Sequence, residues 1–206
     1  MRAMKGLKGL APVGAPMLVV GVALVLLAAC RPPLPGPERQ WRASREAAIR
    51  SALPASALAS FAGVRFFPYD PRVRVRTMLE PLPTPEPLRI AASDGSVRPA
   101  HRLGRVRVVL PGGQAVLSVF QLDDIADRYP DHLFLPFRDA GAGTTTYGAG
   151  RYVEVERAAG GVLEIDFNRA YNPDCAYGIA GRCPVTPEEN TVPFLVAAGE
   201  MLPAGH

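Results

Sequence analysis

Beyond Phe66, glycine and proline divide the chain into short segments, and this division restricts the possible folds more than any other feature. The 206 residues include 20 glycines and 22 prolines, so long helices have little room in this part of the chain. Within the segments, apolar and polar residues alternate, as they do in strands with one face against a core. The pattern predicts a mainly β fold, an antiparallel sandwich or partly closed barrel with a short N-terminal helix.

Turn signals separate the expected strands. Asp94-Gly95 and Gly160-Gly161 are typical of hairpins, and Pro111-Gly112-Gly113 marks a further turn. We predict strands at residues 73–79, 88–92, 97–110, 115–122, 133–137, 152–156, 162–167 and 194–196. Ahead of them, residues 40–53 have the apolar spacing of a short amphipathic helix that ends at Pro54.

The first thirty residues have the order of an export signal. Arg2, Lys5 and Lys8 precede an uncharged run over residues 17–29, and the last four residues, Leu27-Ala28-Ala29-Cys30, have the form of a lipobox. We predict a signal peptide at residues 1–29 and lipidation of Cys30. The mature protein would then lie outside the cytoplasm, in the cell envelope, with its lipid anchor in the membrane.

A membrane-spanning anchor is the alternative, because residues 10–29 are uncharged over about the ~20 residues that cross a bilayer. Pro12, Gly14 and Pro16 interrupt that run and favour the signal peptide. Residues 30–40 comprise the lipidated cysteine and a proline-rich tether, which we expect to be extended. Residues 41–206 then form a single mainly β domain.

The net charge argues against a nucleic-acid partner. The whole chain has a formal charge of +4, and loss of the three basic residues of the signal leaves +1, too little for a dense basic face. Arg72, Arg74 and Arg76 recur at every second position, which places them on one face of a strand. We interpret them as a solvated sheet face, and an anion-binding stripe is the alternative.

The most distinctive motifs lie between residues 139 and 190. They read TTTYGAGRY at 144–152, DFNRAYNPDCAY at 166–177, CP at 183–184 and PEEN at 187–190, after FFPYDP at 66–71 and LPFRD at 135–139. This set, spread over residues 41–200, resembles the uncharacterised bacterial and archaeal family catalogued as domain of unknown function 1684. That family has no assigned reaction, so the resemblance implies no catalytic residues.

Polar residues of the same region are candidate ligand-binding groups: Tyr147, Arg151, Asp166, Asn168, Tyr171 and Asn172. The glycine-bearing loop at 141–150 leads into an expected strand, whereas a phosphate loop leads into a helix. Asp166 and Asn168 are two residues apart and so share one face of an expected strand. The alternative is that these side chains only satisfy the backbone groups of irregular loops.

Cys175 and Cys183 enclose a short loop, and a disulfide is the first interpretation in an exported protein. A zinc site with His101 or His132 is the alternative, although the spacing matches no common zinc motif. A Cys–His nucleophile has less support, because nothing in the sequence places either histidine beside Cys175. We predict no metal and no cofactor.

Three classes of function follow from these residues. The first is a lipid-anchored domain that binds a small ligand or an envelope component through residues 139–190. The second is a cell-envelope hydrolase that uses Asp166, Glu188 or Glu189 as acid or base. In that enzyme Tyr147, Tyr171 or Arg151 would stabilise charge. The third is a structural or interaction protein without a pocket. The sequence does not decide whether the protein is an enzyme, and it leaves the oligomeric state open.

Overall fold

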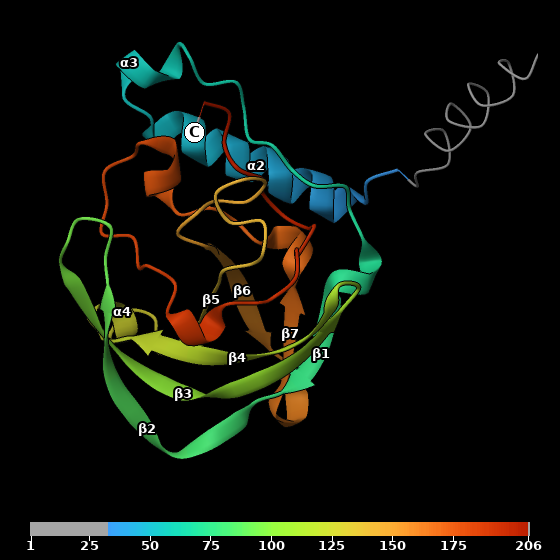
Figure 1. Cartoon of the computed structure of the whole chain (residues 1–206), viewed down its shortest axis with the longest axis vertical. Helices are drawn as coiled ribbons and strands as arrows, with labels where there is room; N and C mark the ends of the chain where they lie inside the picture. Colours follow the sequence, from blue (N-terminus) through green and yellow to red (C-terminus); the bar gives the residue numbers. More distant parts are fainter. Residues whose placement is uncertain (1–32, 206) are drawn as a thin grey trace, which may run out of the picture. The chain divides into compact units, whose positions relative to one another are not determined.

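The computed structural model of the chain describes residues 33–205, so the predicted signal peptide and Cys30 lie outside the described residues. Seven strands form one antiparallel sheet in the order β1-β7-β6-β5-β4-β3-β2 (Figure 1). They are β1 (Arg74–Met78), β2 (Glu80–Ala91), β3 (Val97–Leu110), β4 (Gly113–Leu122), β5 (Phe134–Phe137), β6 (Arg151–Arg157) and β7 (Val162–Asp166). The mainly β fold is therefore as expected.

The sheet curls until its first strand approaches β3. The hydroxyl of Thr77 on β1 donates a hydrogen bond of 2.9 Å to the carbonyl of Arg107 on β3, although four strands lie between them in the sheet order. The fold is thus a half-barrel, which agrees with the partly closed barrel among the two predicted architectures.

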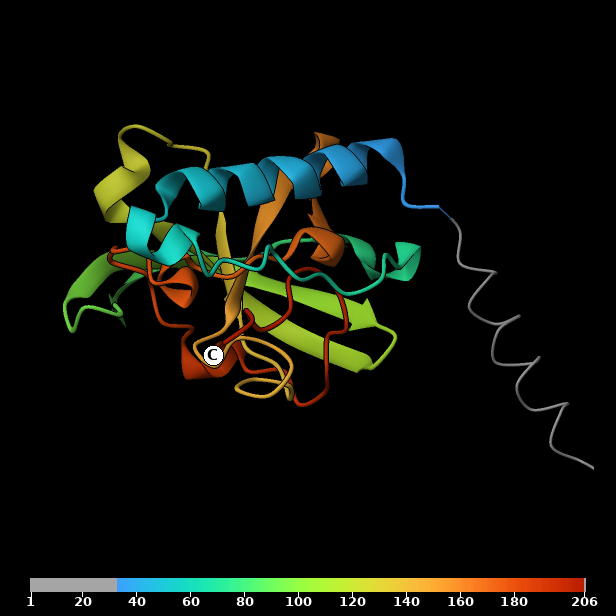
Figure 2. The ribbon, with the colours of Figure 1, turned by 90° about the horizontal axis from the view of Figure 1, so that it is seen from above.

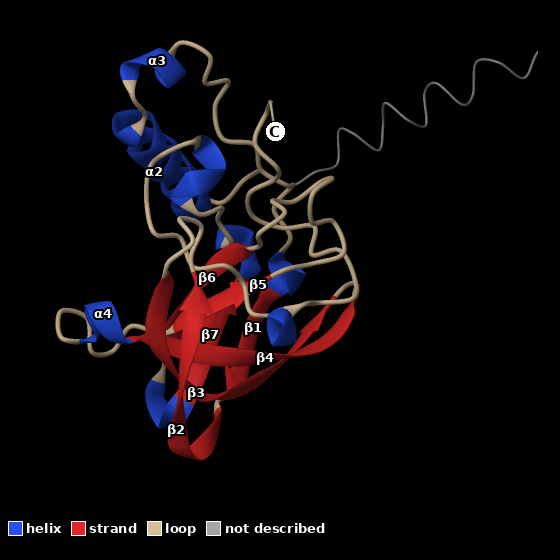
Figure 3. Cartoon of the chain, turned by 60° about the vertical axis from the view of Figure 1, so that its left-hand side comes forward, coloured by secondary structure: helices blue, strands red, loops and turns tan. Residues whose placement is uncertain are grey.

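One large apolar cluster fills the inside of the curl. Its strand residues alternate along each strand, so that the same face of the sheet turns inward throughout. The irregular C-terminal part of the chain completes the cluster, and it lies with the other loops at one end of the strands (Figure 3). Among the buried members are Val106, Val108, Leu117, Val119, Leu135, Phe137, Leu163, Ile165, Phe167, Val192 and Val196.

β2 is an edge strand of the sheet and contains four prolines, Pro81, Pro83, Pro85 and Pro87. Proline has no backbone N–H to donate to a neighbouring strand, so a run of prolines is tolerated best at a sheet edge. The prolines explain why sequence alone predicted a strand only at 88–92, whereas pairing with β3 begins at Glu80.

A 17-residue helix, α2 (Gly36–Ala52), runs along the β domain (Figure 2). Its inward side buries Glu38 and Ile49. The helix begins four residues before the expected start and takes in part of the segment that we predicted as an extended tether. Pro37 is compatible with that start, because the N–H groups of a first helical turn have no partner within the helix.

The remaining helical elements are single turns. They are α3 (Ala55–Leu58), α4 (Asp123–Ala126) and the 3-10 turns η1 (Pro71–Val73), η2 (Ala159–Gly161), η3 (Phe167–Arg169), η4 (Asp174–Tyr177) and η5 (Glu188–Asn190). Within residues 33–205, every helix is too short or too polar to cross a bilayer.

The strand predicted at residues 194–196 is wrong. This segment is irregular, because its backbone bonds to buried side chains and to the backbone N–H of Ala140 rather than to a neighbouring strand. The N–H of Val196 donates to the carboxylate of Asp139 at 3.0 Å, and the Val196 carbonyl accepts from Arg151 at 2.8 Å. A short apolar run predicts burial here, but it does not distinguish a strand from a loop held by buried charges.

Candidate functional site

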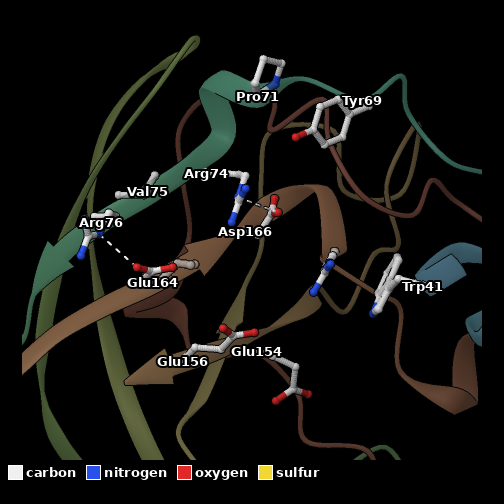
Figure 4. A pocket seen from close by; sticks show the side chains of 12 residues that line it. Trp41, Tyr69, Pro71, Arg74, Val75, Arg76, Glu154, Glu156, Glu164 and Asp166 are labelled. Carbon is white, nitrogen blue, oxygen red and sulfur yellow. Dashed lines mark ion pairs between the residues drawn. The ribbon is translucent and has the colours of Figure 1, made fainter. Parts of the chain in front are cut away.

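A groove of about 490 Å³ lies over the outer face of β1, β7 and β6 (Figure 4). Charged side chains from the three strands form its floor and walls, and two aromatic residues, Trp41 of α2 and Tyr69, stand at one end. Its volume falls within the range of roughly 300–1,000 Å³ that is usual for small-molecule sites.

Strand register arranges the charges of the groove in rows. Arg74 of β1 lies opposite Asp166 of β7, and Arg76 lies opposite Glu164. The Nε atoms of the two arginines are 3.2 Å and 3.1 Å from these carboxylates. The sheet face formed by these arginines is solvated as expected, since 60% and 70% of their side-chain surfaces remain exposed.

The two carboxylates of β6 have weaker partners. Glu154 accepts a 2.8 Å hydrogen bond from the hydroxyl of Tyr171, and its other oxygen is 3.7 Å from Nε2 of His132. Glu156 lies directly opposite Glu164 of β7. No arginine or lysine of the described chain comes within ion-pair distance of either β6 carboxylate.

The aromatic end of the groove is held by α2 and by the segment before β1. Trp41 packs edge-to-face on Phe66, with ring centroids 5.9 Å apart. Close to it, Arg169 lines the groove and pairs at 3.5 Å with the buried carboxylate of Glu38. Trp41 therefore has a fixed position, because the helix that carries it is anchored by a charged contact beneath it.

Arg151 lies away from this groove, inside the domain. Its guanidinium pairs with the buried carboxylate of Asp139 at 2.8 Å and donates to the carbonyls of Val196, Ala198 and Glu200. Burial lowers the pKa of Arg151, while the adjacent Asp139 acts in the opposite direction. The guanidinium therefore has a structural role, because its hydrogen bonds hold the C-terminal segment against β6.

Asn168 and Asn172 are also fully buried and engaged with the backbone. The side-chain amide of Asn168 bonds to both the N–H and the carbonyl of Asp70, at 2.9 Å and 2.8 Å. The amide nitrogen of Asn172 donates to the carbonyl of Met201 at 2.8 Å. These two asparagines thus follow the alternative interpretation, in which polar side chains satisfy the backbone groups of irregular loops.

Only part of the predicted ligand-binding set meets in the groove. Asp166 lines it, and Tyr171 reaches it through the hydrogen bond to Glu154. Sequence reasoning missed Trp41, Tyr69 and the β6 carboxylates as site residues. The alternating charges Glu154 and Glu156 were a usable signal, because residues two apart on a strand share a face.

The cysteines form a separate cluster with Tyr147. The structure has Cys175 and Cys183 as free thiols and does not contain the predicted disulfide between them. The two residues are still neighbours, because the backbone N–H of Cys175 donates to the sulfur of Cys183 at 3.3 Å. Burial raises the pKa of Cys183, and it raises the pKa of Tyr147, whose hydroxyl is 3.9 Å from the sulfur of Cys175, to about 12.

The zinc alternative has no support in the described part of the chain. Residues 33–205 contain no group of three His, Cys, Asp or Glu side chains that could hold a metal ion. The histidines instead contact acids, since His101 lies 2.7 Å from Asp123 and His132 lies near Glu154.

The carboxylates considered for hydrolysis are also divided between places. Asp166 lines the groove, whereas Glu188 and Glu189 belong to η5. Glu189 is paired with Arg102 of β3 at 2.7 Å. The groove therefore brings none of the η5 acids together with Asp166.

Two comparisons place the chain among known proteins. The family model for a protein of unknown function, DUF1684, matches residues 59–201, which contain the whole sheet and the groove's three strands. The chain belongs to the DUF1684 family. Trp41 and the rest of α2 precede the matched DUF1684 region, so one side of the groove is built from outside it.

A solved structure has the same fold as this DUF1684 protein. It is the solution NMR structure of an uncharacterised protein from gene locus rrnAC0354 of Haloarcula marismortui, with a TM-score of 0.57 and 28% sequence identity. The match covers 91% of this chain and 98% of the archaeal chain. No curated protein matches the chain.

Proposed function

We propose that this DUF1684 protein binds a small polar ligand in the groove over β1, β7 and β6. The observation that carries the proposal is the groove itself, a hollow of about 490 Å³ that combines charged strand residues with an aromatic end. The ligand would touch Asp166, which the sequence suggested as a binding residue, and Trp41 and Tyr69, which it did not. It would also touch Arg74, which the sequence raised only as part of an alternative anion-binding stripe.

The proposal includes export and lipid anchoring at Cys30. The support is the order of charged, apolar and small residues before that cysteine. An anchored binding domain would hold its ligand, or an envelope component, at the membrane surface. Metabolic labelling with a fatty-acid analogue tests this part, because the intact chain should be labelled and the Cys30→Ser variant should not.

Ligand binding is tested by filling the groove with a bulky side chain. The full chain would be screened by NMR against a library of small polar metabolites, beside the variant Arg74→Trp. A matched control is Arg72→Trp, because Arg72 is similarly exposed and ion-paired but does not line the groove. Compounds that bind the wild-type chain and the control, and not Arg74→Trp, would support the proposal. If no compound depends on the groove in this way, the proposal is overturned.

A further inference from the structure

The charges of the groove are compensated on one side and not on the other. On β1, Arg74 and Arg76 are each paired with an acid of β7. On the other side of β7, Glu156 of β6 is directly opposite Glu164. Like charges opposite each other on neighbouring strands repel, so this arrangement costs stability unless a cation intervenes.

Neighbouring groups leave the β6 charges largely unneutralised. The hydroxyl of Tyr171 donates to Glu154 at 2.8 Å, but a neutral donor leaves the carboxylate its full charge. Within residues 33–205, His132 is the one basic side chain at ion-pair distance from Glu154, at 3.7 Å, and Glu156 has no ion pair. Arg169, which also lines the groove, is paired with Glu38. The wall formed by β6 therefore has an excess of negative charge, which the arginines of β1 do not neutralise.

The aromatic end of the groove is a second and independent indication. Trp41 and Tyr69 stand beside the Arg74–Asp166 pair, at the end of the groove away from Arg76 (Figure 4). Aromatic rings attract organic cations through the negative potential of their faces. The combination of aromatic rings with carboxylates, in a hollow large enough for a molecule, is suited to an amine.

We propose that the ligand of the groove is a small organic cation, with an ammonium or quaternary ammonium group. The inference rests on the proposed function and names the ligand's chemical class. The ammonium group would lie between the β6 carboxylates and the aromatic end, close to Glu154 and Glu156. The ammonium group would supply a positive charge beside the facing carboxylates of Glu156 and Glu164, and the carbon atoms of the ligand would pack on Trp41.

The test measures dissociation constants by ligand-observed NMR for choline and putrescine, with succinate as the anionic probe. The full chain is compared with Glu156→Gln, Glu154→Gln and Arg76→Gln. Glu80→Gln, on the opposite edge of the sheet, removes one carboxylate outside the groove. Two-dimensional NMR spectra of each variant verify that the fold is retained.

Each variant has an expected direction. Glu156→Gln should weaken binding of a cation by about two- to fivefold, the range for one partly exposed charge contact. Glu154→Gln should act in the same direction, Glu80→Gln should leave the affinity unchanged, and Arg76→Gln should strengthen binding, because it removes a repelling charge. Raising the salt concentration should weaken binding of both cations.

Other outcomes overturn the inference in distinguishable ways. Binding of succinate, weakened by Arg76→Gln, would overturn the cationic class and retain a ligand-binding groove. Cation binding that is equally strong in Glu156→Gln and Glu154→Gln would place the site elsewhere. No binding of choline or putrescine would overturn the cationic class, while the groove-filling experiment above decides separately whether the groove binds anything.

Discussion

The guanidinium of Arg45, on α2, lies 2.8 Å from the carboxylate of Glu200, whose side chain is completely buried. Two further donors reach the same carboxylate, the hydroxyl of Tyr177 at 2.7 Å and the backbone N–H of Asn172 at 2.8 Å. Arg45 also stacks over Tyr171, with its guanidinium carbon 5.1 Å from the ring centre. One contact therefore joins the N-terminal helix, the C-terminal segment and the loop after β7.

Replacing Arg45 by methionine should destabilise the fold by about 3 kcal/mol, because the change leaves the buried charge of Glu200 without its ion-pair partner. In a chain of this size that loss lowers the melting temperature by roughly 6–12 °C. Calorimetry of the two proteins measures it. The control is Arg50→Gln, which breaks the exposed pair with Glu46 on the same helix and should cost about 0.5 kcal/mol or less. Equal losses in the two variants would contradict the role of the buried pair.

Arg151→Lys should be strongly destabilising despite the retained charge. Arg151 donates to four acceptors, and an ammonium group has three donors and no planar fork. At least one buried carbonyl would lose its partner, which costs about 1–3 kcal/mol. Urea unfolding measures the change. Arg157→Lys, at the exposed end of β6, serves as the comparison and should stay within about 0.5 kcal/mol of wild type; a similar loss there would contradict the argument.

The protein should lose stability as the pH rises above 10. Burial raises the pKa of Tyr147 to about 12, and it also raises the pKa values of Tyr152, Tyr171 and Tyr177 above the ordinary value of 10.0. The folded state thus holds these phenolic protons more tightly than the unfolded state. The stabilisation is complete below pH 10 and declines as the pH approaches the folded-state values.

A spectrophotometric titration at alkaline pH measures this effect directly. The chain has six tyrosines, and four of them should ionise late, together with the loss of the native circular dichroism signal. Ionisation of all six near pH 10 in a chain that keeps its native spectrum would contradict the prediction.

Reducing agent should leave the melting temperature unchanged, because Cys175 and Cys183 are free thiols. A thiol reagent added to the unfolded Cys30→Ser variant, purified without reductant, should titrate two thiols. In the folded protein Cys183 should react more slowly, since burial raises its pKa and reduces its thiolate fraction. A drop of several degrees on reduction would show instead that the pair is bridged in solution.

Local patterns predicted the sheet well where one face of a strand is buried. The expected strand at 97–110 has the bounds of β3, because apolar residues alternate along its second half until the turn at Pro111. Residues 194–196 show the limit of such patterns. Val196 is held by Arg151 and Asp139, which are more than forty residues away in the chain, and Leu195 is exposed.

The groove was less predictable than the sheet. It joins a helix residue, Trp41, with strand residues more than a hundred positions later, and only the register of β1, β7 and β6 brings the charges together. Asp166 was recognised because it belongs to a dense polar motif. Arg151 was predicted as a binding residue for the same reason. It is instead buried, because it donates to carbonyls of the C-terminal segment, and backbone carbonyls have no signature in sequence.

The prolines of β2 affect how copies of the domain associate through their sheet edges. An unpaired strand edge invites addition of a strand from another molecule, and that reaction starts many aggregates. Here four residues of the edge have no N–H to offer an incoming chain. Two copies that meet along this edge can separate again, because a continuous ladder of hydrogen bonds cannot grow across the four prolines.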